Sequence, residues 1–384
     1  MAQENEVERK IGVIEFDTGL EAADFDVVAG STPINMVCQR DLKVQCRESE
    51  LVEKKRKSAY LSCCSRVICI LMFCCLPIPV LAQVGIAAKY VRDSGIGSDP
   101  AVVFSENFES SLATWSARFN GGGPSGISTS TDHPFASGGV QSARLIPGGI
   151  SGTLYRQLPT NYDHVWMRYY VKYLGNVSHH SGGYIGGYFP PSSFPQGDAG
   201  INGIRPNGDR VFIAAFEQRG TPDGIAPQTH LGTYNNWVDM PGPGFNGLFF
   251  GRDLLITENP SLNVNTWQCV EMRVKMNSTA ISRDGELQIW VNDSSIQNFV
   301  TGSLVGAYNS VGDWVTGSGS GFPGLLWRDV LTYGVNWIKL QNYNDAGTPY
   351  EVLFDDLAVA TSRIGCINTG SASIPAPENL RVLP

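Results

Sequence analysis

Alternating apolar and polar positions mark several segments of the chain as half-buried strands. In residues 267–276, every second position is apolar, namely Val270, Met272, Val274 and Met276. Because successive side chains of a strand point to opposite faces, this pattern predicts one core face and one polar face. Residues 286–293 follow after a turn at 282–285 and repeat the alternation, so we expect a hairpin. Residues 165–173 and 336–344 show the same division.

From about residue 103 onward, such segments alternate with clusters of Gly, Asn, Asp, Ser and Pro, and no segment keeps a helical period. This organisation predicts an all-β sandwich of two antiparallel sheets. The chain has 384 residues, of which 42% are hydrophobic, 17% are charged and 43 are Gly, which excludes a disordered chain and a coiled coil. The net charge of −8 argues against nucleic acid as a partner.

The N-terminal part follows a different pattern. Residues 54–57 read KKRK, residues 67–76 form an apolar run, and small residues precede position 83. This predicts a signal segment at 54–82 and a secreted protein, extracellular or periplasmic. The ten apolar residues of this run are too few to cross a bilayer. The alternative to a cleaved signal peptide is an uncleaved signal anchor. Residues 1–53 are an extension of uncertain role, consistent with a start codon assigned too far upstream.

The remaining boundaries follow from composition. We expect a linker at 83–103, a β-domain at 104–366 and a Pro/Ser-rich tail at 367–384. Only Cys269 and Cys366 follow residue 83. In an oxidising compartment they are the one available pair, so we predict a disulfide; the alternative is two buried free thiols.

The polar faces of the predicted strands carry Arg, Lys, Gln, Tyr and Trp rather than small polar residues. Aromatic rings stack on sugars, and cationic and amide groups bind hydroxyl groups and carboxylates. The pattern therefore favours a concave sheet that holds a polar polymer. An ordinary solvent-facing sheet is the alternative.

Segments 267–277, 284–290 and 354–365 resemble the C-terminal half of the concanavalin A-like jelly-roll polysaccharide lyases and their uncharacterised bacterial relatives. Residues 104–109 resemble the first strand of the same sandwich. The resemblance spans residues 104–366 and implies a concanavalin A-like β-sandwich jelly roll, with two antiparallel sheets and a concave groove.

Two shorter motifs resemble those of alginate lyases. Residues 337–344, WIKLQNYN, are similar to the strand motif Y-x-K-A-G-x-Y-x-Q, whose second tyrosine is catalytic and matches Tyr343. Residues 228–230, QTH, are similar to the Q-I-H triplet. The resemblance implies β-elimination at a uronate, and the related enzymes alginate lyase and glucuronan lyase define the substrate class.

This elimination requires a group that neutralises the uronate carboxylate, a base for the C5 proton and an acid for the leaving O4. The candidate neutralisers are Gln228 with Arg168 or Arg273, the base is His230, and Tyr343 is the acid, or base and acid in turn. We expect the ammonium of Lys339 to lower the pKa of Tyr343. The expected substrate-binding residues are Lys339, Gln341, Arg273, Lys275, Trp290 and Trp337.

Other residues leave several roles open. His180 precedes the glycine-rich residues 181–187, which we expect to form a mobile loop near the groove, and it is a candidate base, metal ligand or polar loop residue. Glu217 and Glu271 are isolated carboxylates beside arginines, which disfavours a hydrolase. Three carboxylates are candidate ligands of a structural Ca²⁺ ion, namely Glu106, Asp355 and Asp356. The alternative is that these carboxylates cap turns.

The sequence thus favours a secreted polysaccharide lyase that cleaves a uronate-containing, anionic polysaccharide by β-elimination, without a cofactor in catalysis. The alternative is a noncatalytic, lectin-like or LamG-like carbohydrate-binding jelly roll, and a third is a structural surface protein. We expect a monomer with no membrane association beyond the signal segment.

Overall fold

The computed structural model describes residues 85–120, 126–134, 136, 138–146, 151–175, 180–188, 203–208, 211–219, 229–244, 247–255, 261–343 and 350–369. The predicted extension at 1–53, the signal segment at 54–82 and residues 370–384 of the predicted tail lie outside these ranges. None of the helices that the structure describes has the length and hydrophobicity to cross a membrane.

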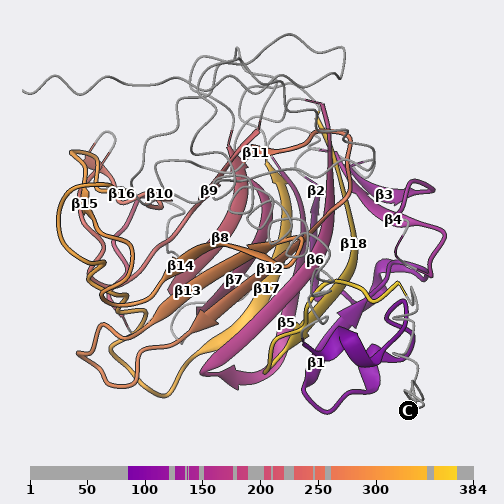
Figure 1. The fold of residues 1–384 in the computed structure, drawn as a ribbon, viewed down its shortest axis with the longest axis horizontal. Helices are drawn as coiled ribbons and strands as arrows, with labels where there is room; N and C mark the ends of the chain where they lie inside the picture. The colour runs from indigo at the N-terminus through magenta and orange to yellow at the C-terminus, as the bar shows by residue number, and fades with distance from the viewer. Residues whose placement is uncertain are drawn as a thin grey trace, which may run out of the picture. The chain divides into compact units, whose positions relative to one another are not determined.

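The first sheet has eight strands in the order β14-β13-β12-β6-β18-β4-β3, with β1 also paired to β18 (Figure 1). All its pairs are antiparallel. The strands are β1 (Val102–Glu106), β3 (Ile127–Ser130), β4 (Ser142–Leu145), β6 (His164–Leu174), β12 (Gln268–Lys275), β13 (Glu286–Val291), β14 (Ser294–Phe299) and β18 (Glu351–Ala360).

The second sheet has seven antiparallel strands in the order β11-β9-β8-β7-β17-β5-β2. They are β2 (Ala117–Asn120), β5 (Ser151–Tyr162), β7 (Ser181–Tyr188), β8 (Val211–Arg219), β9 (Thr229–Thr233), β11 (Ser261–Leu262) and β17 (Val335–Tyr343). A small third sheet contains β10 (Leu254–Leu255), β15 (Gly306–Tyr308) and β16 (Trp314–Thr316). The helices among the described residues are short 3₁₀ turns: η1 (Ile86–Lys89), η2 (Ile96–Ser98) and η3 (Leu112–Thr114).

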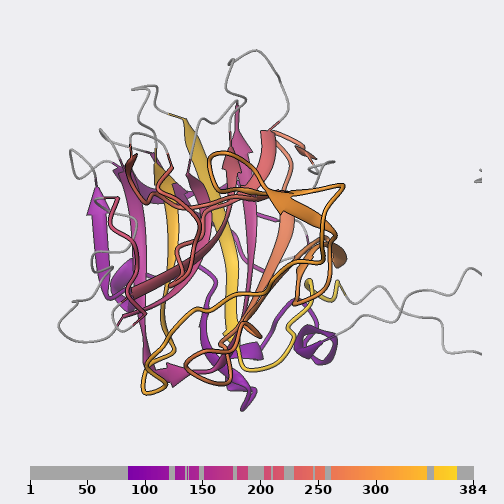
Figure 2. The same ribbon diagram turned by 90° about the vertical axis from the view of Figure 1, so that its left-hand side faces the viewer.

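The core lies between the two large sheets (Figure 2). The apolar alternation of the sequence decides which face of each strand turns inward. Val270, Met272 and Val274 of β12 are fully buried in this core, as are Ile338 and Leu340 of β17. The predicted antiparallel β-sandwich jelly roll is therefore confirmed.

The segment expected to be a linker, residues 83–103, is part of the sandwich from residue 85 onward. Ile86, Ala87 and Ile96 are buried against Trp166 and Ala358, on the face of the eight-stranded sheet that is turned away from the core. This segment packs on the sheet because its apolar residues, which lie at the two 3₁₀ turns, form a small hydrophobic cluster there. Composition alone did not reveal this burial.

The glycine-rich residues 181–187, predicted to be a mobile loop, form β7 in the middle of the seven-stranded sheet. A Cβ atom on Gly183 would lie 2.3 Å from the ring of Tyr169, and one on Gly186 would lie 2.2 Å from the ring of Trp337. The glycines therefore make room for large rings on both faces of the strand. This need for space, rather than flexibility, explains the composition.

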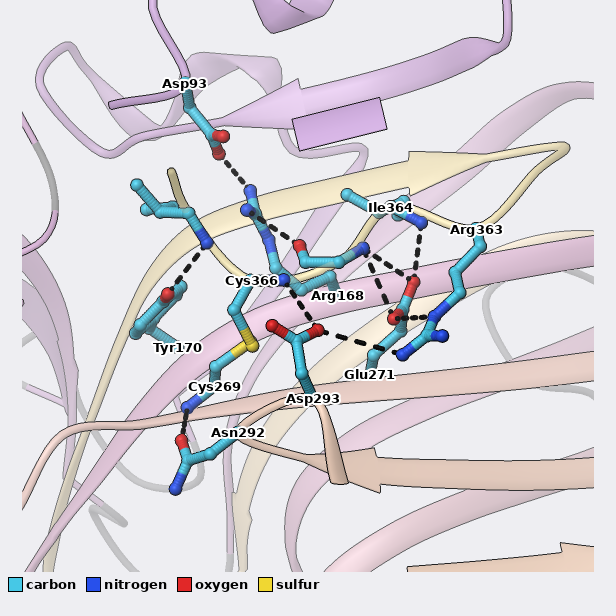
Figure 3. The surroundings of a disulfide bond; sticks show 12 residues. Asp93, Arg168, Tyr170, Cys269, Glu271, Asn292, Asp293, Arg363, Ile364 and Cys366 are labelled. Atoms are coloured by element: carbon cyan, nitrogen blue, oxygen red, sulfur yellow. Dashed lines mark hydrogen bonds and ion pairs between the residues drawn. A yellow bond between two sulfur atoms is a disulfide. The ribbon is translucent and has the colours of Figure 1, made fainter. Parts of the chain in front are cut away.

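Cys269 of β12 and Cys366 form the predicted disulfide, with a Cα–Cα distance of 5.9 Å. Figure 3 shows that the bond holds the C-terminal segment against the eight-stranded sheet. Glu271 of β12 accepts hydrogen bonds from the N–H groups of Ile364 (2.7 Å) and Gly365 (3.2 Å) in the same segment. The disulfide and the buried carboxylate therefore fix the same stretch of chain.

Candidate functional site

A group of polar and aromatic side chains gathers on the face of the seven-stranded sheet that is turned away from the core. In the strand register, Lys339 of β17 is opposite Tyr184 of β7, and Tyr184 is opposite Ala215 of β8, two residues before Glu217. Residues directly opposite each other share a face, so β8, β7 and β17 bring these side chains together. The group, called the polar cluster below, consists of His180, Tyr184, Glu217, Tyr234, Lys339, Gln341 and Tyr343.

His180 is the central residue of the polar cluster. Its Nδ1 lies 2.8 Å from Oε1 of Glu217, and its side chain is 29% exposed. The rings of Tyr234 and Tyr343 meet it edge to face, with centroid distances of 5.0 and 5.7 Å. Its backbone has φ of +56°, a conformation uncommon for residues other than glycine. Such a conformation persists only where the surroundings impose it, and it often accompanies a functional role.

Glu217 lies beneath His180 and is fully buried. Besides its contact with His180, its carboxylate accepts a hydrogen bond from the Tyr184 hydroxyl. Burial, together with the Glu217 charge, raises the pKa of Tyr184 well above its ordinary value. Tyr184 therefore stays protonated and remains a hydrogen-bond donor to the carboxylate.

Lys339 is buried below His180 rather than exposed to a substrate, and the partly exposed Gln341 links the two residues. Lys339 is 2% exposed, and its Nζ lies 3.8 Å from the ring centroid of Tyr184 and 2.7 Å from Oε1 of Gln341. Gln341 in turn donates to the carbonyl oxygen of His180 at 3.1 Å. Burial lowers the pKa of Lys339 to about 7, although the Glu217 charge acts in the opposite direction. The expected substrate-binding role of Lys339 is corrected to one of support, and that of Gln341 stays a prediction.

The polar cluster thus presents two partly exposed groups that can move protons, His180 and Tyr343, above buried supporting groups. An imidazole and a phenol whose rings are in contact can act as base and acid on one substrate. Tyr343 and His180 were both candidates from the sequence, and the structure brings them together.

The sequence candidate His230 is placed differently. His230 lies on β9, opposite Arg219, and β9 is three strands away from β17. Three strand spacings amount to about 14 Å, so the backbone of His230 is remote from that of Tyr343. Its side chain lies outside the described residues, as does the whole of Gln228. His180 is the histidine of the described side chains that contacts Tyr343.

Arg168 was proposed as a neutraliser of the substrate carboxylate, and its position corrects that assignment. It lies on β6 of the eight-stranded sheet, is fully buried, and forms an ion pair with Asp93 (Figure 3). Asp93 belongs to the segment that was expected to be a linker. This ion pair therefore fastens that segment to the sheet, and a substrate has no access to the guanidinium.

The other expected substrate-binding residues also lie outside the polar cluster. Arg273 and Lys275 of β12 pair with Glu286 in the eight-stranded sheet. Trp290 of β13 stacks on Trp166 in that sheet, with ring centroids 5.0 Å apart. Trp337 is on β17 but is fully buried, so a sugar cannot stack on it. These placements correct the expected single platform, because local alternation does not tell which sheet a strand joins.

Sequence reasoning missed Glu217, Tyr184 and Tyr234 as members of the site. One signal was available for Glu217, because it directly continues residues 211–216, which are apolar at every position and buried on both faces. A carboxylate that continues such a strand is a candidate for a functional buried charge. Tyr184 and Tyr234 carried no comparable signal.

The carboxylates proposed for Ca²⁺ lie at the paired strands β1 and β18, as expected. Asp356 and Glu106 line a cavity of about 450 Å³ together with Asp93 and Glu109. Glu106 also accepts hydrogen bonds from the Phe108 N–H group (2.9 Å) and the Thr114 hydroxyl.

The neighbouring Asp355 is buried as well. Burial raises the pKa of both Asp355 and Asp356. Within the described residues, no group of three or more His, Cys, Asp or Glu side chains has an arrangement that would hold a metal ion. The Ca²⁺ site stays a prediction.

No protein-family model matches the chain, and no curated protein matches it either. Among solved structures, it is similar to alginate lyase Aly36B, with 13% identity over 70% of this chain and 99% of that one and a TM-score of 0.43. The endo-β-1,4-glucuronan lyase of the fungus Trichoderma reesei has 13% identity over 68% and 95%, with a TM-score of 0.36. The carbohydrate recognition domain of Emp47p has 14% identity over 62% and 90%, with a TM-score of 0.29. At these identities, the likeness concerns the fold.

Proposed function

We propose that the protein is a secreted polysaccharide lyase that cleaves a uronate-containing polymer by β-elimination, with His180 and Tyr343 as its proton-transfer groups. The observation that carries this proposal is the position of His180, which is held in an uncommon backbone conformation between Glu217 and Tyr343. This role replaces the one assigned to His230 from the sequence.

The proposed reaction needs one proton acceptor and one proton donor. His180 takes the C5 proton of the uronate through Nε2, since its Nδ1 faces Glu217. The electron pair of the C5–H bond forms the C4–C5 double bond, and the C4–O4 bond breaks. Tyr343 gives its phenolic proton to the departing oxygen, so the products are an unsaturated uronate and a free hydroxyl group.

The uronate carboxylate also needs a hydrogen-bond donor, because its negative charge opposes removal of the C5 proton. Gln228 remains the candidate from the sequence for this role, and it lies outside the described residues. Arg168 and Arg273 are not neutralisers in this proposal, because they belong to the opposite sheet.

The composition of the polar cluster supports a lyase over a hydrolase. A glycoside hydrolase that follows the usual mechanism needs two carboxyl groups on either side of the bond it cleaves. Among its described members, the polar cluster contains one carboxylate, Glu217, and that group is fully buried beneath His180.

A noncatalytic carbohydrate-binding domain is the second candidate. Tyr234 and Tyr343 are both partly exposed, and the rings of both contact His180. Tyrosine rings in this arrangement suit stacking on a sugar ring. Such a domain requires the rings but no proton transfer.

The test is the absorbance near 235 nm of the full chain incubated with alginate, glucuronan and other uronate polymers, since an unsaturated uronate absorbs there. We expect a rise that is lost in His180→Ala and in Tyr343→Phe, with circular dichroism spectra unchanged. Lys275→Met, on the opposite sheet, is the control that keeps activity. Binding of a polymer without any rise in absorbance would support the noncatalytic domain instead.

A further inference from the structure

We infer that Glu217 is the positioning residue of His180: it holds the imidazole in the tautomer that carries its proton on Nδ1 and fixes the orientation of the ring. Nε2 is then the basic nitrogen, turned toward the substrate. This inference rests on the proposed role of His180 as the base.

The contact has the features of a charge-assisted hydrogen bond. Nδ1 of His180 and Oε1 of Glu217 are 2.8 Å apart, and Glu217 has no exposed surface. A carboxylate accepts but does not donate, so an adjacent neutral imidazole must place its proton on the nitrogen that faces it. Since water does not reach the carboxylate, this bond is stronger than the same contact at the surface.

The surroundings hold both partners in place. The second carboxylate oxygen accepts the Tyr184 hydroxyl, so Glu217 cannot rotate without losing that bond. The carbonyl oxygen of His180 accepts from Gln341, whose side-chain oxygen is in turn bound by Lys339. His180 is therefore fixed at its backbone and at its ring.

One basic side chain of the polar cluster, Lys339, interacts electrostatically with Glu217. The Glu217 charge favours the protonated form of Lys339 on β17, whereas burial favours its neutral form. The remaining titratable groups of the polar cluster that face His180 are Tyr184 on β7, Tyr234 after β9, and Tyr343 at the end of β17. None of these three carries a positive charge.

The chain has five histidines, which makes a direct test practical. Nitrogen NMR on the full chain with ¹⁵N-labelled histidine distinguishes the two tautomers, and the His180→Gln variant assigns the signal. We expect His180 to be mostly the Nδ1–H form in the wild type and to shift toward the Nε2–H form in Glu217→Gln, because the amide NH₂ group donates to Nδ1. His164, which contacts Arg273 on the other sheet, is the internal reference and should not change. An unchanged tautomer for His180 would overturn the inference.

The kinetic result separates positioning from a general loss of structure. For Glu217→Gln, we expect kcat to fall by roughly 100-fold to 10,000-fold, by analogy with the loss of the carboxylate behind a catalytic histidine, while KM changes little. Glu217→Asp, which keeps the charge, should recover part of the rate. Equal rates in Glu217→Gln and the wild type would contradict the inference.

The two proposals fail in different ways. If the wild type cleaves no uronate polymer, the proposed function fails, and the NMR experiment still decides whether Glu217 sets the tautomer. If the wild type is active and the tautomer does not respond to Glu217→Gln, the inference alone is wrong.

Discussion

Gly186 lies directly against the indole ring of Trp337: a Cβ atom on Gly186 would be 2.2 Å from Cζ2 of that ring. The two residues are opposite each other in the register of β7 and β17; His180 directly precedes β7, and Tyr343 is the last residue of β17. The contact explains why glycines are needed in a central strand. It also links the packing of Trp337 to the geometry of the polar cluster.

Gly186→Ala should therefore destabilise the protein. The added methyl group has no space, and overpacking of this kind costs about 1–3 kcal/mol or more in the free energy of unfolding. Gly138→Ala is the control, because a Cβ atom there would meet its nearest neighbour at 3.9 Å. Urea denaturation of both variants measures the difference. Equal midpoints would show that β7 and β17 are not packed as described.

Loss of the Cys269–Cys366 disulfide should lower stability by about 4–5 kcal/mol, since the bond closes a loop with a sequence separation of 97 residues. The expected result is a lower Tm for the double variant Cys269→Ala/Cys366→Ala in thermal unfolding. The single variant Cys366→Ala should match it, because either change removes the bond. A Tm equal to that of the wild type would contradict the prediction.

Asp93→Asn should also destabilise the fold, because it leaves the buried guanidinium of Arg168 without its ion-pair partner. Removing one member of a buried pair costs about 3–5 kcal/mol. Arg168 lies in the eight-stranded sheet, and Asp93 lies in the segment packed on that sheet. We therefore expect kcat of the folded fraction to stay the same. Arg168→Met should behave alike in denaturation and turnover measurements. A fall in kcat without loss of stability would return Arg168 to the catalytic set.

The lowered pKa of Lys339 predicts that the stability of the fold depends on pH. Burial lowers the pKa of Lys339 in the folded state to about 7. Between about pH 7 and 10.5, the unfolded chain therefore binds a proton at this lysine that the folded protein does not. Above pH 10.5, the lysine is neutral in both states. Stability therefore rises with pH in this window, by at most about 1.4 kcal/mol per pH unit from this group.

Lys339→Met should lack this slope. Urea denaturation at pH 7, 8 and 9 compares the wild type with the variant, and the difference in unfolding free energy should change in favour of the wild type as the pH rises. Lys275→Met, which removes an ammonium paired with Glu286, should keep the wild-type slope. Parallel curves for the wild type and Lys339→Met would refute the assignment.

The cavity at β1 and β18 provides a test of the predicted Ca²⁺ site. If Glu106 and Asp356 bind the ion, millimolar Ca²⁺ should raise Tm and EDTA should reverse the rise, because binding to the folded state alone stabilises it. Glu106→Gln should reduce the response. The same Tm for the wild type with and without Ca²⁺ would contradict the predicted Ca²⁺ site.

The strands could be predicted from the sequence because their signal is local. Residues 165–173, 267–276 and 336–344 alternate with a period of two, and the structure has β6, β12 and β17 there, each with the expected face in the core. The pairing of Cys269 and Cys366 followed from their being the last two cysteines of the chain.

The site depended on relationships that no local pattern contains. Alternation gives each strand a polar face but not the sheet to which it belongs, so Arg168 and Tyr343 were expected in one groove although they lie in opposite sheets. His180 and Glu217 are 37 residues apart and meet only because β7 and β8 pair. The sequence by itself therefore determined the strands and their inward faces, since burial of apolar side chains follows a short period. Only the tertiary structure decided which polar faces meet, because strand order depends on contacts between distant parts of the chain.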